Sequence, residues 1–447
     1  MAQRPDWSRP AAAARPEGPR HRELRRQPRR PCFDDGAMVS VTRTPTTLVS
    51  VDEARRTLLG LVSPLGAEDV ALDEALGRVL AEDVVAATDL PGIDNSAMDG
   101  YAVASRDVSR ARSDAPVILA LGAESRAGHP PPPHQPRTAT VITTGAPVPS
   151  GADAVVPVED TLRTGRRVQI RTVPVTGAYV RRRGHDVRQG TVVASAGTRL
   201  RSVDIGVCAA AGRAQVSVAV RPRVALLSSG DELVPPGSTP LPHQVTDVNS
   251  SMLAAAVREA GGCVTHTDVI ADDRSAVTSA LIRAGERADL IVSSAGVSMG
   301  GHDHLRECVA ALGAVDVWKV AMRPGKPIVI GRVVKTPFIG LPGNPVSSAV
   351  TFLLFARAAI LAMQGAEELQ PPVFPAILGD SFHTPAHLET YVRVRLRRDG
   401  KNLVATSSGG QGSDMMHALS GADALALIPA GLAEAMVGTP VGVMVLP

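Results

Sequence analysis

Three loops rich in glycine and serine carry the residue types of an anion-binding site. They are Ser228–Glu232, Ser293–Gly301 and Gly340–Pro345. Two of these loops lead directly into expected helices, and the exposed N–H groups of a helix N-terminus favour an anionic ligand. Asp231, Glu232 and Asp303 lie beside the loops, and carboxylates next to a phosphate indicate a hard divalent cation that bridges the two. These residue types predict a site for a phosphate or another oxyanion together with a divalent cation.

A simpler interpretation of the loops is structural, because glycines make tight turns and acidic residues cap helices. For a single loop both interpretations stay open, whereas three loops at one edge of a sheet favour a ligand. The segment from Gly296 to Gly301 lacks the GxGxxG spacing of a dinucleotide-binding turn, and no Gly-Lys-Ser/Thr follows it as in a P-loop. The residues alone therefore indicate an anion and metal site without identifying the ligand.

The three loops require an α/β unit to position them. Val224–Leu227 is an unbroken apolar run, which is typical of a strand buried on both faces of a sheet. Further strands are expected at 264–270, 290–292, 328–331 and 338–339, with helices at 250–259, 304–312 and 346–363 and one capped by Asp272 or Asp273. This alternation predicts a doubly wound, largely parallel sheet, in which ligands bind at the carboxyl ends of the strands.

The rest of the chain shows two other patterns. Helices are expected after the capping residue Ser50 and over 72–80. Short strands between glycine, proline and aspartate turns follow, and these are expected at 116–121, 140–143, 154–158, 168–172 and 191–193. The last 75 or so residues alternate apolar and polar side chains, which predicts a small β-domain.

Composition limits the class of protein. Formal net charge is only +3, and residues 1–37 hold nine arginines against five acids, so the remaining chain is near neutral and predicts neither a nucleic-acid nor a membrane partner. Residues 1–44 are rich in proline and arginine and are expected to be disordered, with Met38 a candidate start. The most apolar stretch, Ala349–Met363, contains Arg357 and is expected to be a buried helix. Four scattered cysteines without a CxxC pair predict reduced thiols in a cytoplasmic protein.

Six sequence blocks resemble those of the MoeA family and occur in the family's order. They are Leu90–Val103, Thr144–Pro149 with Gly151–Val156, Ser229–Leu233, Gly296–Ser298 with Asp303, Pro324–Pro327 and Gly340–Ser347. The resemblance extends from about residue 45 to the C-terminus. It implies an elongated protein with α/β and β domains. Domain I is expected at 45–90 and 179–220, a β-rich domain II inserted at 91–178, a molybdopterin-binding α/β domain III at 221–366 and a β-barrel domain IV at 367–447.

The resemblance also implies an activity. Members of this family take adenylylated molybdopterin and molybdate and release molybdenum cofactor and AMP with the help of Mg²⁺. It implies a homodimer with a composite active site, and transient contacts with the molybdopterin adenylyltransferase and with apo-molybdoenzymes. The phosphates of the adenylylated pterin and the tetrahedral molybdate dianion both fit the anion and metal site that the loops predict.

The resemblance assigns roles to individual residues. The residues expected to be catalytic are Asp99, Asp186 and Asp303, and those expected to bind substrate or nucleotide are Thr144, Arg181, Asp231, Ser298, Pro342 and Asn344. The residues expected to hold the metal are Glu232, Asp272 and Asp303, and those expected to hold molybdate are Arg323, Lys326, Arg393 and Ser413. In the dimer, Asp99, Thr144, Arg181 and Asp186 are expected to reach the partner's domain III. The pattern Tyr-Val-Arg-Val-Arg-Leu around Arg393 would by itself predict an exposed residue of a β-strand.

The chain departs from the family pattern at five positions. His185 replaces a common Glu, Tyr179 a common Asn, and Gly301-His302 a pair that usually contains an acid. Arg323 replaces a common Lys, which keeps the charge and changes its geometry. His302 and His304 flank Asp303, so zinc is an alternative to Mg²⁺.

Other functions remain as alternatives. The adenylylation of molybdopterin is one, because the enzyme of that step resembles domain III alone. A non-catalytic scaffold or paralogue and an enzyme that inserts tungstate are the others. The block at 90–103 and the C-terminal domain favour molybdate insertion.

Overall fold

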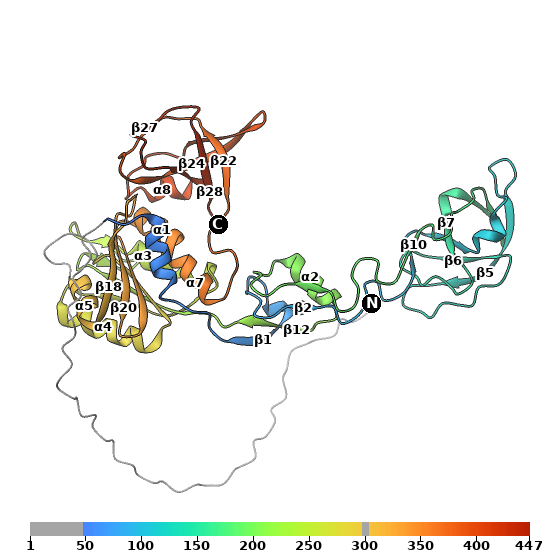
Figure 1. The fold of residues 1–447 in the computed structure, drawn as a ribbon, viewed down its shortest axis with the longest axis horizontal. Helices are drawn as coiled ribbons and strands as arrows, with labels where there is room; N and C mark the ends of the chain where they lie inside the picture. Colours follow the sequence, from blue (N-terminus) through green and yellow to red (C-terminus); the bar gives the residue numbers. More distant parts are fainter. Residues whose placement is uncertain (1–47, 297–303) are drawn as a thin grey trace, which may run out of the picture. The chain divides into compact units, whose positions relative to one another are not determined.

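Residues 48–296 and 304–447 are described in the computed structural model of this chain. Ser298, Gly301, His302 and Asp303 lie outside the described residues, as does the segment 1–47. The α/β sheet has the strand order β16-β13-β17-β21-β20-β18 (Figure 1). Its strands are β13 (Arg223–Ser229), β16 (Cys263–Ile270), β17 (Leu290–Ser294), β18 (Gly313–Lys319), β20 (Pro327–Val333) and β21 (Thr336–Leu341). β13 pairs in parallel with β16 and β17, and β17 with β21, whereas β20 runs antiparallel to β18 and β21. The largely parallel sheet is confirmed.

Apolar side chains cover both faces of this sheet. Along β13, Val224 and Leu226 join one buried cluster, whereas Ala225 and Leu227 join another. The first cluster contains side chains of α1 (Val51–Leu59), α3 (Val248–Glu259) and the helix over 345–363. The second contains those of α4 (Arg274–Arg287) and α5 (His304–Leu312). Because side chains alternate along a strand, an unbroken apolar strand supplies both cores, and the doubly wound prediction is confirmed (Figure 1).

The most apolar helix is continuous from Pro345 to Met363. It consists of α6 (Pro345–Thr351), a π-helical turn η4 (Phe352–Ala356) and α7 (Arg357–Met363). By length and composition it could cross a membrane, yet 83% of its most apolar window is buried inside the protein. That burial matches the core helix expected from the sequence.

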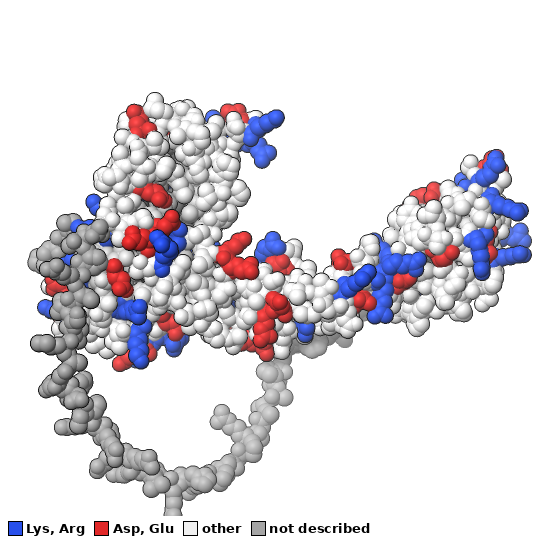
Figure 2. All heavy atoms as spheres, in the orientation of Figure 1, with Lys and Arg blue, Asp and Glu red and all other residues white. Residues whose placement is uncertain are grey.

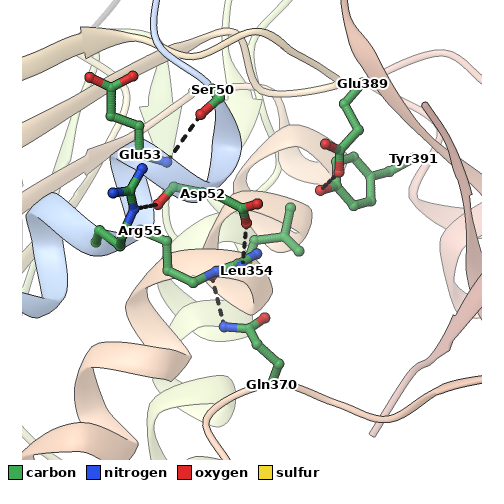
Figure 3. A network of polar contacts seen from close by, with 9 residues as sticks. Ser50, Asp52, Glu53, Arg55, Leu354, Gln370, Glu389 and Tyr391 are labelled. Atoms are coloured by element: carbon green, nitrogen blue, oxygen red, sulfur yellow. Dashed lines mark hydrogen bonds and ion pairs between the residues drawn. The ribbon is translucent and has the colours of Figure 1, made fainter. Parts of the chain in front are cut away.

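Polar side chains fasten α1 to this helix (Figure 3). The Leu354 carbonyl in the π-helical turn accepts from Arg55 Nε at 3.4 Å and from Gln370 Nε2 at 3.3 Å. Arg55 also pairs with Asp52 at 3.0 Å. α1 therefore belongs to the core of the α/β sheet, although the sequence groups it with the first segment of domain I.

The prediction of a helix over 72–80 is wrong. Only the 3₁₀ turn η1 (Leu72–Glu74) forms there, and Gly77 has a φ of +72°. Val79 and Leu80 instead form β-bridges with Arg199 and Val218. A left-handed glycine and pairing to a distant segment override the local helical pattern.

Two stretches far apart in sequence share one small core. β1 (Ala67–Ala71) pairs with β12 (Gln215–Ala219), and β2 (Val84–Val85) pairs with β11 (Val192–Ala194). α2 (Ser202–Ala210) buries Cys208 in the same cluster as Leu80 and Val218.

The intervening stretch forms a six-stranded sheet with the order β7-β4-β6-β5-β9-β8. Its strands are β4 (Gly100–Val103), β5 (Val117–Ser125), β6 (Thr138–Ile142), β7 (Ala154–Pro157), β8 (Thr161–Thr164) and β9 (Arg167–Ile170). The turns η2 (Ser105–Val108) and η3 (Val158–Asp160) lie among these strands, and β3 (Asn95–Ser96) pairs with β10 (Val180–Arg181) beside them. The expected strands at 116–121, 140–143 and 154–158 are confirmed.

The C-terminal region closes into a five-stranded barrel. The barrel strands are β22 (Val373–Leu378), β24 (Glu389–Asp399), β25 (Asn402–Ser407), β26 (Ala424–Ile428) and β28 (Pro440–Val445). The ring closes because β24 pairs with both β25 and β26. β19 (Met322–Arg323) also pairs with β24, in parallel. The smaller elements are β14 (Leu233–Val234), β15 (Val245–Thr246), β23 (Phe382–His383), β27 (Glu434–Ala435) and α8 (Met416–Ser420).

The charged surface is mixed. Figure 2 shows acidic and basic side chains interspersed among uncharged ones over one face. This mixture agrees with the small net charge of the whole chain, +3.

We expect Leu58→Ala to destabilise the α/β unit by about 2–5 kcal/mol, because Leu58 is completely buried and its loss leaves a cavity under α1. Urea unfolding followed by the fluorescence of Trp318 on β18, in a Trp7→Phe background, measures this. Arg56→Ala on the exposed side of α1 is the control, expected within about 0.5 kcal/mol of the parent. Equal unfolding midpoints for the two variants would show that α1 is not part of this core.

Candidate functional site

The described residues of the three glycine- and serine-rich loops, which for the second loop are 293–296, meet at the carboxyl edge of the α/β sheet, as their positions after parallel strands predict. Ser228 and Ser294, near the ends of β13 and β17, lie with their hydroxyl oxygens 3.3 Å apart. A Cβ at Gly343, after β21, would approach the Cβ of Ala295 to 3.3 Å. The loops border a cleft of about 720 Å³, which we name the edge cleft. Pro342 and Asn344 line it together with Glu232 and Gly296, and the role of the first two in binding substrate stays a prediction.

Three acidic side chains lie close to one another next to this cleft, and of these Glu232 lines it, whereas Asp231 and Asp272 do not. The Asp272 backbone N–H donates to Asp231 Oδ1 at 3.3 Å. Partial desolvation, reinforced by the negative charges of Asp231 and Glu232, raises the pKa of Asp272 above the usual carboxyl range. Asp273 caps α4 by accepting from the Ala276 N–H at 2.8 Å, which leaves Asp272 for the acidic group.

The acidic group has the chemistry of a hard-cation site. A Cβ at Gly230 would meet the Glu232 carboxylate at 2.7 Å, so the glycine makes room for that carboxylate over the loop. Within residues 48–296 and 304–447, no three His, Cys, Asp or Glu side chains converge closely enough to hold a metal by themselves. Mg²⁺ retains several waters and is bound through one or two carboxylates plus substrate phosphates, so the oxygen donors present fit it.

A second cleft, of about 470 Å³, lies at the start of β20. Arg323, Lys326 and Ser413 line it, and their role in holding an oxyanion stays a prediction. Both cationic side chains are exposed. Phe382 and Val392 form part of an apolar wall. We name this the cationic cleft.

The two clefts are contiguous. Pro327, Ser347 and Asp414 line both. Asn344 Nδ2 in the edge cleft donates to Ser413 Oγ in the cationic cleft at 2.7 Å. The N–H of Val346 in the first turn of α6 donates to the Ser413 carbonyl at 3.0 Å, so the loop that carries Ser413 is fastened to the N-terminus of this helix.

Arg393 is not the exposed strand residue that its local pattern predicts. The side chain is 1% exposed, and one terminal nitrogen donates to the carbonyls of Gly410 and Gly412 at 2.6 and 3.0 Å. Burial lowers the pKa of its guanidinium. Arg393 does not line the cationic cleft but holds the loop that carries Ser413, and its contact with molybdate stays a prediction. The alternation of apolar and polar residues predicted the strand correctly. The loop that contains Gly410 and Gly412 covers the side of β24 on which Arg393 lies, and the alternation cannot show this.

Four of the expected site residues lie on or beside the inserted sheet. Asp99 Oδ1 accepts from the Thr144 N–H at 2.6 Å and from its hydroxyl at 3.0 Å, and these bonds lower the pKa of Asp99. Arg181 pairs with Asn95 between β10 and β3, and Asp186 follows a short turn later. The four side chains are exposed, and none of them lines the edge cleft or the cationic cleft.

Sequence reasoning missed the first turn of α3. Asp247 and Asn249 line the edge cleft and are only 4% and 7% exposed. Asp247 caps the helix by accepting from the Ser250 N–H at 3.0 Å. An aspartate directly before a helical pattern is a capping signal, and that signal pointed to this turn.

Three family models match successive parts of the chain. "MoeA N-terminal region (domain I and II)" matches residues 49–212, "Probable molybdopterin binding domain" matches 225–362 and "MoeA C-terminal region (domain IV)" matches 375–446.

Two relatives and one solved structure are similar over most of their length. The chain is 38% identical over 397 residues to molybdopterin molybdenumtransferase 2 of Mycobacterium tuberculosis, covering 87% of this chain and 98% of that protein. It is 36% identical over 413 residues to molybdopterin molybdenumtransferase of Nostoc sp., covering 90% and 95%. The crystal structure of a molybdopterin biosynthesis moeA protein from Pyrococcus horikoshii OT3 is 28% identical, with a TM-score of 0.77 over 90% of this chain and 100% of that chain.

We expect the affinity of the edge cleft for Mg²⁺ to fall as the pH is lowered, at pH values where an ordinary aspartate is still charged. The reason is the raised pKa of Asp272. As the pH falls, protons compete with Mg²⁺ for the Asp272 carboxylate, and the protonated group is no longer a negatively charged ligand. Calorimetric titration with Mg²⁺ between about pH 4.5 and 7 measures the midpoint of this loss. Asp231→Asn removes one of the charges that raise the pKa of Asp272, so the midpoint should move to lower pH. Asp273→Asn, at the helix cap, is the control, and a midpoint that Asp231→Asn leaves unchanged would contradict the assignment.

Proposed function

This chain belongs to the MoeA family, and we propose that it acts as a molybdopterin molybdenumtransferase in molybdenum cofactor biosynthesis. In the proposed reaction, adenylylated molybdopterin and molybdate yield molybdenum cofactor and AMP with the help of Mg²⁺. The observation that carries the proposal is the contiguity of the two clefts, which share Pro327, Ser347 and Asp414. One cleft has glycine- and serine-rich loops and acidic side chains, and the other has two exposed cationic side chains. A substrate with an adenylyl phosphate at one end and a dithiolene at the other fits such a pair.

The cationic cleft supplies charge for the oxyanion. Arg323 and Lys326 donate charge-assisted hydrogen bonds to molybdate, a tetrahedral dianion, and the Ser413 hydroxyl lies on the same wall. Insertion then balances without an outside oxidant or reductant. The two thiols of the dithiolene form bonds to molybdenum and lose their protons, and one oxygen of molybdate leaves with both protons as water.

The edge cleft binds the adenylyl end. Asn344 and the N–H groups at the loop edges face the phosphates, and hydrolysis of the phosphoanhydride consumes one water and releases AMP. Glu232 and Asp272 would hold Mg²⁺ together with the substrate phosphates and Asp303, which lies outside the described residues. Bound Mg²⁺ would neutralise charge on the phosphoanhydride. The roles of Asp303 and Ser298 rest on the family pattern alone.

We propose that the working form is a homodimer with composite active sites. Asp99, Thr144, Arg181 and Asp186 line neither cleft of their own chain. A partner copy would bring these groups to the edge cleft, and the bond between Asp99 and Thr144 would keep the carboxylate ionised there. The supplier of adenylylated pterin and the apo-molybdoenzymes that receive the cofactor are the proposed transient partners, in the cytoplasm.

The alternatives differ in what the protein would do with its substrates. An enzyme of the adenylylation step would consume ATP, and a scaffold would release no AMP. Matches over residues 49–212 and 375–446, outside the α/β unit, favour molybdate insertion over adenylylation. Tungstate has the shape and charge of molybdate, so the choice between them depends on the cationic cleft, where Arg323 replaces the common lysine.

We expect the purified protein to release AMP from adenylylated molybdopterin in the presence of molybdate and Mg²⁺, and to yield cofactor that reconstitutes a molybdoenzyme apoprotein. Lys326→Ala should raise the KM for molybdate about ten- to a hundredfold, the loss expected for one charge-assisted hydrogen bond. Lys335→Ala, on an exposed turn that lines neither cleft, should not change it. ATP-dependent formation of the adenylylated pterin without AMP release would sink the proposal in favour of the earlier step, and parallel assays with tungstate decide the preferred oxyanion.

At a molybdate concentration far below the raised KM of Lys326→Ala, we expect Asp99→Ala and Lys326→Ala each to show little activity alone and to complement each other in mixed dimers. If the active site is composite, a heterodimer keeps one intact site, formed by the clefts of the first variant and the Asp99 of the second. Random exchange of subunits should then restore about a quarter of wild-type activity, because half of the dimers are mixed and each has one working site. A mixture that stays inactive after confirmed exchange of subunits would contradict a composite site.

A further inference from the structure

A buried chain of polar side chains lies beneath the edge cleft. The Ser228 hydroxyl is 3.0 Å from that of Ser250 in α3 and 3.3 Å from that of Ser294. Asn249 Nδ2 donates to Ser294 Oγ at 3.1 Å and to the Gly343 carbonyl at 2.7 Å. The first turn of α3 is therefore connected to the loops that follow β13, β17 and β21.

Asn249 is the member of this chain that touches two loops at once. Its side-chain nitrogen has two hydrogens, and one is used on each loop. The carbonyl of Gly343 can only accept, so the nitrogen of the amide must face it, and this fixes the orientation of the side chain. With the residue only 7% exposed, water does not compete freely for these bonds.

The two loops that Asn249 holds are tightly constrained. Ala295 and Gly296, directly after Ser294, both have left-handed backbone conformations, with φ of 71° and 73°. A non-glycine residue in this region is strained and persists only where its surroundings hold it. Gly343 faces Ala295 so closely that an added Cβ would come within 3.3 Å. The spacing of these loops sets the width of the edge cleft.

We propose that Asn249 is a positioning residue for the adenylyl end of the substrate, because its amide fixes the loops at 294–296 and 342–344 to either side of the cleft. This inference rests on the proposed function, since it assigns the edge cleft to the nucleotide. Asn249 acts on the substrate indirectly, through Ser294 and the backbone of Gly343. The oxyanion in the cationic cleft is held by other side chains, and Asn249 reaches them only through the bond between Asn344 and Ser413, so the effect on the oxyanion should be smaller.

Aspartate is the informative replacement for Asn249. It keeps the shape of the side chain, removes both donors, and places a carboxylate against the carbonyl of Gly343. A second variant, Ser294→Ala, removes one of the two contacts and leaves the other. Asn402→Asp makes the same chemical change at an exposed position on β25 and serves as the matched control.

The test compares two ligands. We expect Asn249→Asp to weaken the binding of AMP, measured by calorimetry with Mg²⁺, about tenfold or more, as for the loss of a buried hydrogen bond. The KM for adenylylated molybdopterin should rise in parallel and by more than the KM for molybdate, because Asn249 bonds directly to the loops of the edge cleft and reaches the cationic cleft only through the bond between Asn344 and Ser413. Ser294→Ala should show a smaller loss of the same kind, and Asn402→Asp none.

The outcomes separate the positioning role from the proposed function. A folded Asn249→Asp protein with wild-type affinity for AMP would overturn the inference, as would equal increases in both KM values. If Asn249→Asp does not fold, Ser294→Ala decides by the same two measurements. A wild-type protein that neither binds nor releases AMP would overturn the proposed function itself, and the assignment of Asn249 with it.

Discussion

The parallel pairing of β17 with β13 on one side and β21 on the other is the constraint on which both clefts depend. Parallel strands end at the same edge, so three loops that are distant in sequence must meet there. The sheet can keep this arrangement because helices bury it on both faces through two separate apolar clusters. Its edge, in contrast, is polar. Strand-end hydroxyls such as those of Ser228 and Ser294 are buried and lie within hydrogen-bond distance of one another.

The barrel depends on a different interaction, the burial of Arg393. Removing a guanidinium from water is unfavourable unless its hydrogens find acceptors. Here the carbonyls of Gly410 and Gly412 accept from one terminal nitrogen, whereas the buried Nε has no hydrogen-bond partner among the described residues, and the Gln411 side chain bonds to the Arg393 backbone in both directions. The result is a stiff loop whose end carries Ser413 and Asp414 to the N-terminus of α6. The contact between Asn344 and Ser413 joins this loop to the sheet edge, so the two clefts share a wall.

Local sequence patterns were sufficient to predict much of the α/β fold. Val224–Leu227 predicted a doubly buried strand, and His304–Leu312 predicted α5, because periodicity and burial are both local properties of a sequence. Long-range pairing was not predictable in this way. The helix expected over 72–80 did not form because Val79 and Leu80 pair with residues more than a hundred positions later. Arg393 lies on a strand that the alternation of apolar and polar residues predicted correctly. A loop covers the outward side of this strand, and the sequence of the strand itself gives no sign of that loop. Asn249 was also missed because its contacts are long-range. The two loops to which it bonds are distant in sequence and become its neighbours only in the folded protein.

The opposite charges of the two clefts explain how one surface could sort two anionic substrates. The edge cleft is bordered by Glu232, Asp247 and Asp414, so an anion enters it favourably only with a divalent cation or with contacts to the loop N–H groups. The cationic cleft needs no such help, because Arg323 and Lys326 face it as permanent positive charges. In the proposed reaction, free molybdate, which brings no cation and makes no nucleotide contacts, would therefore be directed to the cationic cleft. An adenylyl phosphate that carries Mg²⁺ would be directed to the edge cleft. Asp414, which lines both, adds a negative charge at the boundary and penalises an anion that moves from one cleft into the other.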